Sequence, residues 1–153
     1  MKRFVFRAQV ALDLRLKQED EAKRLVAIAQ QKVLDARHAL DAACRQLDEG
    51  IAKGRDADAA GDLVVGMWYR NWSVGQHQRI EQCRRLLQTQ ESLLGEARAL
   101  ALLARRKAKS LERFRDRAWQ RHTRQEAREE QKQLDEHGAL RFALGPGKGG
   151  TNT

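Results

Sequence analysis

The residues that could do chemistry are four histidines and two cysteines: His38, His77, His122, His137, Cys44 and Cys83. A zinc site needs such ligands at short spacings, and a nucleophilic site needs a thiol or hydroxyl beside a base. Neither spacing occurs here. Gly147 and Lys148 are similar to the end of a phosphate-binding loop, but Phe142 stands where its first glycine belongs. The sequence therefore predicts no catalytic residue, no metal site and no cofactor.

The charged residues are grouped along the sequence more strongly than the histidines and cysteines. The net charge is +9, and residues 105–124 hold nine Lys or Arg against Glu112 and Asp116. Residues 125–136 reverse the sign, with five acids against Arg128 and Lys132. A basic run is either a solvated helix face or a surface for an acidic partner, which includes nucleic acid, lipid and an acidic protein cavity.

Aromatic side chains are also grouped. Trp68, Tyr69 and Trp72 follow an apolar run that ends at Met67. Aromatic and methionine side chains are over-represented in protein interfaces, so this cluster is a candidate partner site. The alternative is that the segment folds back on its own helices.

Long helices must carry these groups. From Ile80 to Ala118 apolar and small residues alternate at spacings of three and four, the a/d period of a coiled coil: Ile80, Cys83, Leu87, Gln90, Leu94, Ala97, Ala101, Ala104, Ala108 and Leu111. A second row, Leu86, Leu93 and Leu100, repeats every seven residues beside it. The sequence predicts that this row broadens the buried face.

A matching seam lies nearer the start, over residues 8–49. Alanines repeat every seven residues and larger apolar residues repeat between them: Ala22, Ala29, Ala36, Ala43, Val26, Val33, Leu40 and Leu47. Small residues on one helix make room for large ones on the other. If the two seams pair antiparallel, the numbers of facing residues sum to roughly 123, which brings Cys44 within about a turn of Cys83.

The predicted fold is all-α, a long antiparallel two-helix coiled-coil hairpin with an overhanging second helix. We expect residues 1–142 to form this single hairpin, with a first helix over about 4–50, a glycine-rich tip over 51–69 and a second helix over about 70–137. The remaining residues, 143–153, are expected to form a disordered Gly-rich tail.

Composition agrees with this fold class. Charged residues make up 33% and aromatic residues 5%, and there is one proline, which is typical of long helices rather than a thick core. No stretch approaches the roughly 20 apolar residues of a membrane span, and the opening residues lack the apolar run of a signal peptide. Both cysteines are interpreted as reduced thiols, and we expect a cytoplasmic protein.

The two ends of the chain resemble a known family. The opening resembles the F-x-F-R-x-Q-x-x-L-D-L-R pattern of the FliJ family of flagellar type III export proteins, at Phe4, Phe6, Arg7, Gln9, Leu12, Asp13, Leu14 and Arg15. The close, over residues 105–136, resembles the family's Lys/Glu/Arg-rich C-terminal arm. With the arm lengths, the resemblance covers nearly the whole chain.

The resemblance implies a non-enzymatic stalk, similar to that of rotary ATPases, which sits in the hexameric flagellar export ATPase. It also implies contacts with the cytoplasmic ring of the export gate and with export chaperones, and a peripheral location at the inner-membrane export apparatus. The expected ATPase-ring residues are Phe4, Arg7, Arg15, Arg105, Arg106, Arg113, Arg117 and Arg121. The expected gate or partner residues are Met67, Trp68, Tyr69 and Trp72.

Three other functions stay open. One is the equivalent stalk of a virulence type III secretion system, which would have the same physical properties and differ in the apparatus that it serves. Another is a basic helical nucleic-acid binder that uses residues 105–124, although no nucleic-acid partner is expected from the resemblance. A helix lying in a membrane interface is disfavoured, because an alanine-rich stripe suits another helix better than lipid.

Overall fold

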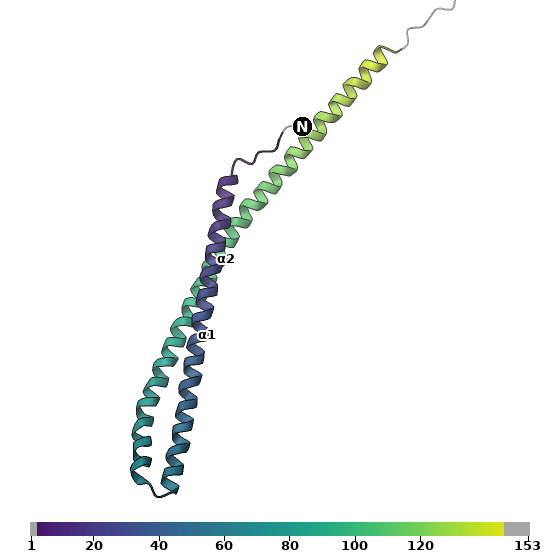
Figure 1. Cartoon of the computed structure of the whole chain (residues 1–153). Coiled ribbons are helices and arrows are strands. Elements are labelled where there is room, and N and C mark those ends of the chain that lie inside the picture. Colours follow the sequence, from purple (N-terminus) through teal and green to yellow (C-terminus); the bar gives the residue numbers. More distant parts are fainter. Residues whose placement is uncertain (1–2, 146–153) are drawn as a thin grey trace, which may run out of the picture. The chain divides into compact units, whose positions relative to one another are not determined.

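The computed structural model describes residues 3–145, which form two long helices. Helix α1 spans Gln9–Ala59 and helix α2 spans Leu63–Ala143, and a short turn joins them (Figure 1). The described residues contain no strand. The predicted all-α two-helix hairpin is therefore confirmed.

Contacts divide the chain into two compact units. The hairpin unit is Arg15–Arg106, and it contains the turn. The terminal unit combines Met1–Leu14 with Lys107–Thr153. The prediction that residues 1–142 form a single domain stays a prediction, and the two units are described separately below.

The turn occupies three residues and is closed by backbone hydrogen bonds. Asp62 N–H donates to the Ala57 carbonyl at 2.9 Å, and Gly61 N–H donates to the Asp58 carbonyl at 3.1 Å. These two bonds form a Schellman motif, in which Gly61 takes the left-handed conformation with φ of 80°. Asp62 then caps α2, because its carboxylate accepts the Val65 N–H at 3.2 Å.

The predicted tip over 51–69 is wrong, because almost all of it is helical. Helix α1 runs on to Ala59 and α2 begins at Leu63. Gly50 and Gly54 lie within α1, where each makes room for an aromatic ring of α2. A Cβ on Gly50 would collide with the Trp72 indole, and one on Gly54 would lie 3.0 Å from Tyr69 Cβ. These glycines permit close packing rather than ending the helix.

The predicted end of the second helix near residue 137 is also too early. Helix α2 continues through Gly138 to Ala143. A single glycine costs a helix about 1 kcal/mol, which a long helix tolerates. Gly145 precedes Pro146 in the sequence. Proline disfavours the helical conformation of the residue before it, so a helix is expected to end before this pair. The predicted disordered tail lies mainly in residues 146–153, outside the described residues.

The two predicted seams form the interior of the hairpin unit. Every predicted seam residue of α1, and those of α2 from Ile80 to Ala104, is buried or half-buried. In the half nearest the turn, Ala43, Leu47 and Ile80 form a core cluster. Both cysteines are free thiols that pack against this cluster, as the predicted register requires.

The register follows from close contacts across the hairpin. Gly54 faces Tyr69, a pair whose numbers sum to 123, and Gly50 faces Trp72, a pair that sums to 122. Between them and the core cluster, the buried Gln76 side chain donates from Nε2 to the Ala43 carbonyl at 3.1 Å. The same Nε2 also donates to Gln46 Oε1 at 3.4 Å. A buried amide whose acceptors both lie on α1 opposes sliding of the helices, because an unpaired buried polar group is costly.

The second leucine row does not broaden the buried face, and that prediction is wrong. Leu86, Leu93 and Leu100 are 49%, 45% and 62% exposed. The physical reason is that two helices can cover only one narrow stripe of each other. The row therefore stands beside the seam, on the surface of the hairpin unit.

The glycine–aromatic contacts lead to a stability prediction. Gly50→Ala should destabilise the protein by about 1–3 kcal/mol, because the added methyl group overfills the space that Trp72 occupies. Gly95→Ala is the matched control, since nothing lies within 4 Å of its added Cβ. It should stabilise the helix by about 0.5–1 kcal/mol. Denaturant unfolding followed by circular dichroism measures both, and equal shifts of the same sign would contradict the packing described.

Candidate partner-binding surfaces

In the terminal unit, aromatic side chains attach the opening segment to α2. The Phe4 ring meets Trp119 edge-on, with centroids 5.1 Å apart, and meets His122 at 5.4 Å. Phe6 is buried, with its ring centroid 5.6 Å from that of Phe114. Aromatic pairs at these separations contribute about 0.5–1.5 kcal/mol each beyond area burial. Phe4, a predicted ATPase-ring residue, thus also packs within the terminal unit itself.

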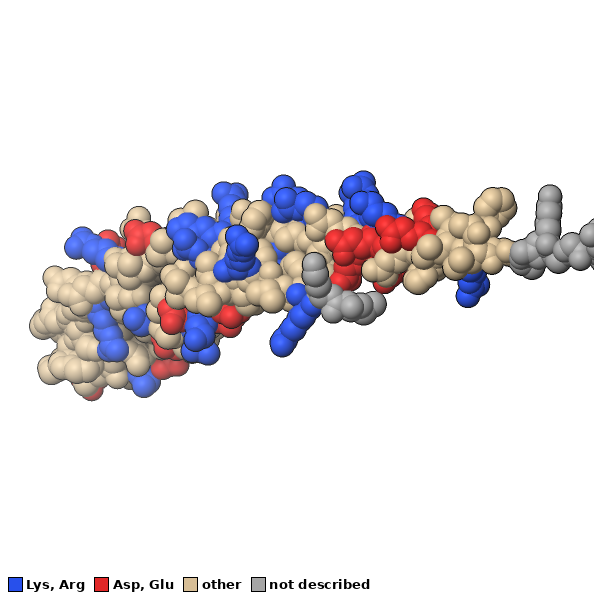
Figure 2. Space-filling view, turned by 90° about the horizontal axis from the view of Figure 1, so that it is seen from above, with Lys and Arg blue, Asp and Glu red and all other residues tan. Residues whose placement is uncertain are grey.

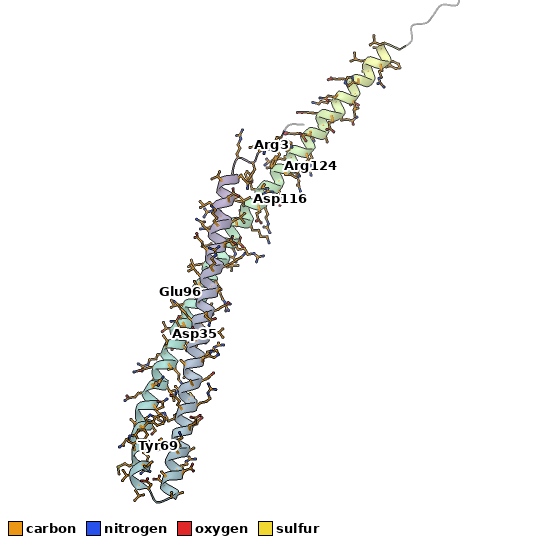
Figure 3. The ribbon with its side chains drawn as sticks, in the orientation of Figure 1. Arg3, Asp35, Tyr69, Glu96, Asp116 and Arg124 are labelled. Atoms are coloured by element: carbon orange, nitrogen blue, oxygen red, sulfur yellow. The ribbon has the colours of Figure 1, made fainter. Side chains whose placement is uncertain are left out.

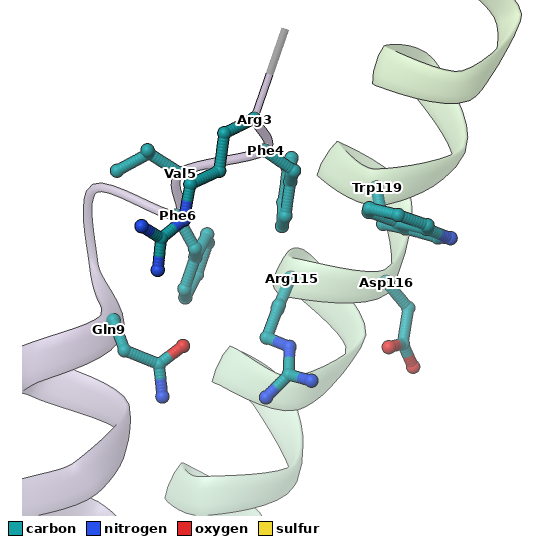
Figure 4. Close-up of a pocket in the computed structure, with 8 residues that line it drawn as sticks. All are labelled: Arg3, Phe4, Val5, Phe6, Gln9, Arg115, Asp116 and Trp119. Atoms are coloured by element: carbon teal, nitrogen blue, oxygen red, sulfur yellow. The ribbon is translucent and has the colours of Figure 1, made fainter. Parts of the chain in front are cut away.

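A pocket of about 630 Å³ lies between the opening segment and α2. Figure 4 shows the rings of Phe4 and Phe6 and the Trp119 indole beside the guanidinium groups of Arg3 and Arg115. Gln9, Val5 and Asp116 complete the lining. Apolar rings beside guanidinium groups suit an apolar side chain next to a carboxylate.

The predicted basic residues are mostly exposed. Arg7, Arg113, Arg117 and Arg121 are exposed in the terminal unit, and Arg105 and Arg106 are exposed in the hairpin unit. Arg15, also in the hairpin unit, is half-buried and donates to Gln18 Oε1 at 3.1 Å. Within the described residues, no acidic group lies within 4.0 Å of the guanidinium groups of the predicted arginines. Their charge is therefore available to a partner.

Beyond the basic run, α2 changes character. Glu126 is its last half-buried residue, and residues 127–145 are all exposed. No described residue covers this part of the helix, as predicted for the overhang. Figure 2 shows acidic side chains gathered towards the C-terminal part of α2, with Lys and Arg side chains projecting from the surface elsewhere.

At the turn end of the hairpin unit, the predicted aromatic site divides into two groups. Tyr69 and Trp72 are half-buried, and both pack against α1. Tyr69 is labelled near the turn in Figure 3. Met67 and Trp68 are each 58% exposed. Folding back on the chain's own helices therefore describes Tyr69 and Trp72, whereas Met67 and Trp68 are left exposed, and their role as a partner site stays a prediction.

Helical periodicity explains part of the division. Extended back from Ile80, the alternation of four and three places Gln76, Ser73 and Tyr69 on the seam, and Trp72 lies beside Ser73. The Trp72 ring packs against α1 because Gly50 leaves room for it. Met67 and Trp68 fall between seam positions, together with Leu63 and Val64, which are 66% and 80% exposed. Those four residues form the apolar tip, an exposed patch next to the turn.

The sequence reasoning missed the contribution of Trp119, Phe114 and Arg3. The predicted register could have indicated Trp119, because the residue numbers of Phe4 and Trp119 also sum to 123. The described residues include no group of three or more His, Cys, Asp or Glu placed to hold a metal ion. Neither described helix has a stretch apolar enough to cross a membrane.

The fold and its surfaces define a class, an all-helical hairpin protein with an apolar tip and a basic, aromatic terminal unit left exposed. Within that class, the family model described as "Flagellar FliJ protein" matches residues 6–147 of the 153. The chain belongs to the FliJ family, a family of non-catalytic components of flagellar protein export. No curated protein and no solved structure matches it.

The aromatic attachment of the opening segment is testable. Trp119→Ala should release this segment, because Phe4 loses its closest ring partner. We expect amide hydrogen exchange at residues 6–12 to accelerate several-fold, while exchange around Ala43 stays unchanged. Phe142→Ala is the matched control, because Phe142 is 92% exposed on the same helix. Equal exchange in the two variants would mean that the aromatic contacts do not hold the segment.

Proposed function

We propose that the chain is a non-enzymatic stalk of the flagellar type III export apparatus, connecting a hexameric export ATPase to the export gate and assisting chaperone and substrate handling. Membership of the FliJ family indicates that the process is flagellar protein export. The observation that carries the finer role is the exposed apolar tip on a two-helix hairpin. A tip of this kind suits a partner, because Trp68 and Met67 are each 58% exposed and Trp68 packs only edge-on against Tyr69, with ring centroids 4.9 Å apart.

The terminal unit supports the ATPase end of the proposal. Its arginines carry charge without acidic partners in the described part of the chain, and the pocket beside them combines rings with guanidinium groups. An acidic, partly apolar channel is the complementary surface. Continuous helices suit a stalk, because the backbone hydrogen bonds between their end turns are satisfied within each helix.

This proposal places the protein in the cytoplasm, peripheral to the membrane through its protein partners. The stalk of a virulence secretion system would use the same contacts, but the family match favours the flagellar apparatus. Nucleic-acid binding by residues 105–124 is the competing outcome. It predicts salt-dependent DNA binding at physiological ionic strength with no response of the ATPase.

The ATPase contact is tested by reversing three exposed charges. Replacing Arg113, Arg117 and Arg121 by glutamate should weaken binding to the export ATPase about tenfold or more, because each exposed ion pair contributes about 0.2–1 kcal/mol and reversal adds repulsion. The loss should be larger at low salt, since exposed charges are screened over about 8–10 Å near physiological ionic strength. ATPase stimulation by the purified chain is the measurement.

Its matched control carries the same change in net charge elsewhere. Arg24, Arg45 and Arg79 are exposed in the hairpin unit, and their replacement by glutamate should leave stimulation within about twofold of the native value. Equal losses in both triple variants would reduce the effect to net charge. DNA binding without ATPase stimulation by the native chain would refute the stalk.

The gate contact is tested at the tip. Trp68→Ala combined with Met67→Ala should abolish export in cells while ATPase stimulation stays intact, because neither side chain packs in the core. Trp72 is unsuitable for this test, since its removal would leave a cavity against Gly50. Leu134→Ala is the control, a truncation of an exposed apolar residue on the same helix. Loss of stimulation in the tip variant, with stimulation kept in the arginine variant, would reverse the orientation.

A further inference from the structure

The pocket between the opening segment and α2 combines uncovered apolar surface with unpaired positive charge. Trp119 is 50% exposed and Val5 is 73% exposed, and both line the pocket. The guanidinium groups of Arg3 and Arg115 line it as well, and no acidic group of the described residues lies within 4.0 Å of either. A ligand that complements the pocket must therefore bring both an apolar group and a negative charge.

The two guanidinium groups come from different walls of the pocket. Arg3 lies on the opening segment and Arg115 lies on α2 (Figure 4). Asp116 is the one acidic residue of the lining, so two guanidinium groups against one carboxylate leave the lining positive. An acid bound between the walls accepts hydrogen bonds from both guanidinium groups, which strengthens each of them through its charge. Such a ligand would join the opening segment to α2.

The remaining polar group favours a peptide over an inorganic anion. Gln9 donates from Nε2 to Asp13 Oδ1 at 2.9 Å, which leaves its Oε1 atom to accept a hydrogen bond from a ligand. Figure 4 shows this oxygen on the side of the rings. A peptide supplies a main-chain N–H, a carboxylate and an apolar side chain together, whereas an inorganic anion supplies charge alone. The volume of about 630 Å³ lies within the range of roughly 300–1,000 Å³ typical of ligand pockets.

We propose that this pocket binds an acidic segment of a partner protein in which a large apolar residue is adjacent to Asp or Glu. The apolar side chain packs against Trp119 and Val5, and the carboxylate accepts hydrogen bonds from Arg3 and Arg115. Only the source of the segment, an export partner, rests on the proposed function. The chemistry of the ligand follows from the pocket alone.

Isothermal titration calorimetry of the full chain with a short peptide tests the ligand chemistry. The probe is a terminally blocked peptide in which adjacent glutamate and leucine residues are flanked by glycine and serine. We expect one peptide to bind per chain, with a dissociation constant of roughly 10–500 µM. Replacing the peptide's glutamate by glutamine, or its leucine by serine, should each weaken binding about fivefold or more, because one charge pair or one apolar contact is lost. Equal affinity for the probe and either control peptide would overturn the proposal.

A pair of protein variants separates the pocket from net charge. Arg115→Gln should weaken binding of the probe about three- to tenfold, because one of the two guanidinium groups is lost. Arg128→Gln is the matched control, since Arg128 is exposed on the same helix, changes the net charge equally and does not line the pocket. It should stay within about twofold of the native affinity. Equal losses in the two variants would reduce binding to general attraction by a basic protein and overturn the proposal.

Amide hydrogen exchange gives a readout that charge attraction alone does not move. The bound probe should slow exchange at residues 6–12 several-fold in the native chain, because it joins the opening segment to α2. In Arg115→Gln, at the same peptide concentration, this slowing should be largely lost. Calorimetric binding without any slowing would place the peptide elsewhere on the chain and overturn the proposal. A single-stranded oligonucleotide that displaces the probe and slows exchange at the same residues more strongly would assign the pocket to nucleic acid instead.

The calorimetric and exchange measurements use no ATPase. A chain that binds the probe as described but does not stimulate the export ATPase would leave the pocket's ligand assigned and refute the stalk. Stimulation of the ATPase by a chain that does not bind the probe would do the reverse. The two proposals therefore fail separately.

Discussion

The structure depends on one interaction, the packing of the small-and-large seam of α1 against that of α2. Ala36 and Ala43 are almost fully buried although alanine offers little apolar surface of its own. They stabilise the hairpin by letting the opposing backbone approach, so that leucine and isoleucine side chains can fill the space between the helices. Because this seam is a narrow stripe of a and d positions, it leaves the other faces of both helices to solvent or to partners.

That narrowness explains where the candidate binding surfaces lie. Near the turn the seam takes in Tyr69 and Trp72 against two glycines, and the residues between seam positions, Met67 and Trp68, are left outside. In the terminal unit the opening segment is not helical before Gln9, so aromatic rings rather than a seam attach it to α2. The pocket lined by Arg3 and Arg115 is a consequence of that attachment.

A two-helix hairpin also has to keep its register without a thick core. Alanine and leucine seams alone tolerate a shift of seven residues, because the pattern repeats. Features that occur once therefore decide the register: the Gly50–Trp72 contact, the Gly54–Tyr69 contact and the Gln76 hydrogen bond to the Ala43 carbonyl. All three lie in the half of the hairpin nearest the turn, where Gly61 and Asp62 reverse the chain.

The sequence by itself determined the fold class and both seams, because heptad spacing and the alternation of small and large residues can be read along the chain. It predicted a register, which the contacts of Gly50, Gly54 and Gln76 fix in the structure. It also determined the family. It did not determine the role of Gly50 and Gly54, since a helix breaker and a close-packing glycine are the same residue until the opposing ring is placed. Only the tertiary structure decided that Trp72 lies inside while Trp68 lies outside, and that the row of Leu93 and Leu100 is uncovered. The burial of a side chain depends on which residues of the other helix pack against it, and one helix cannot cover two faces of another.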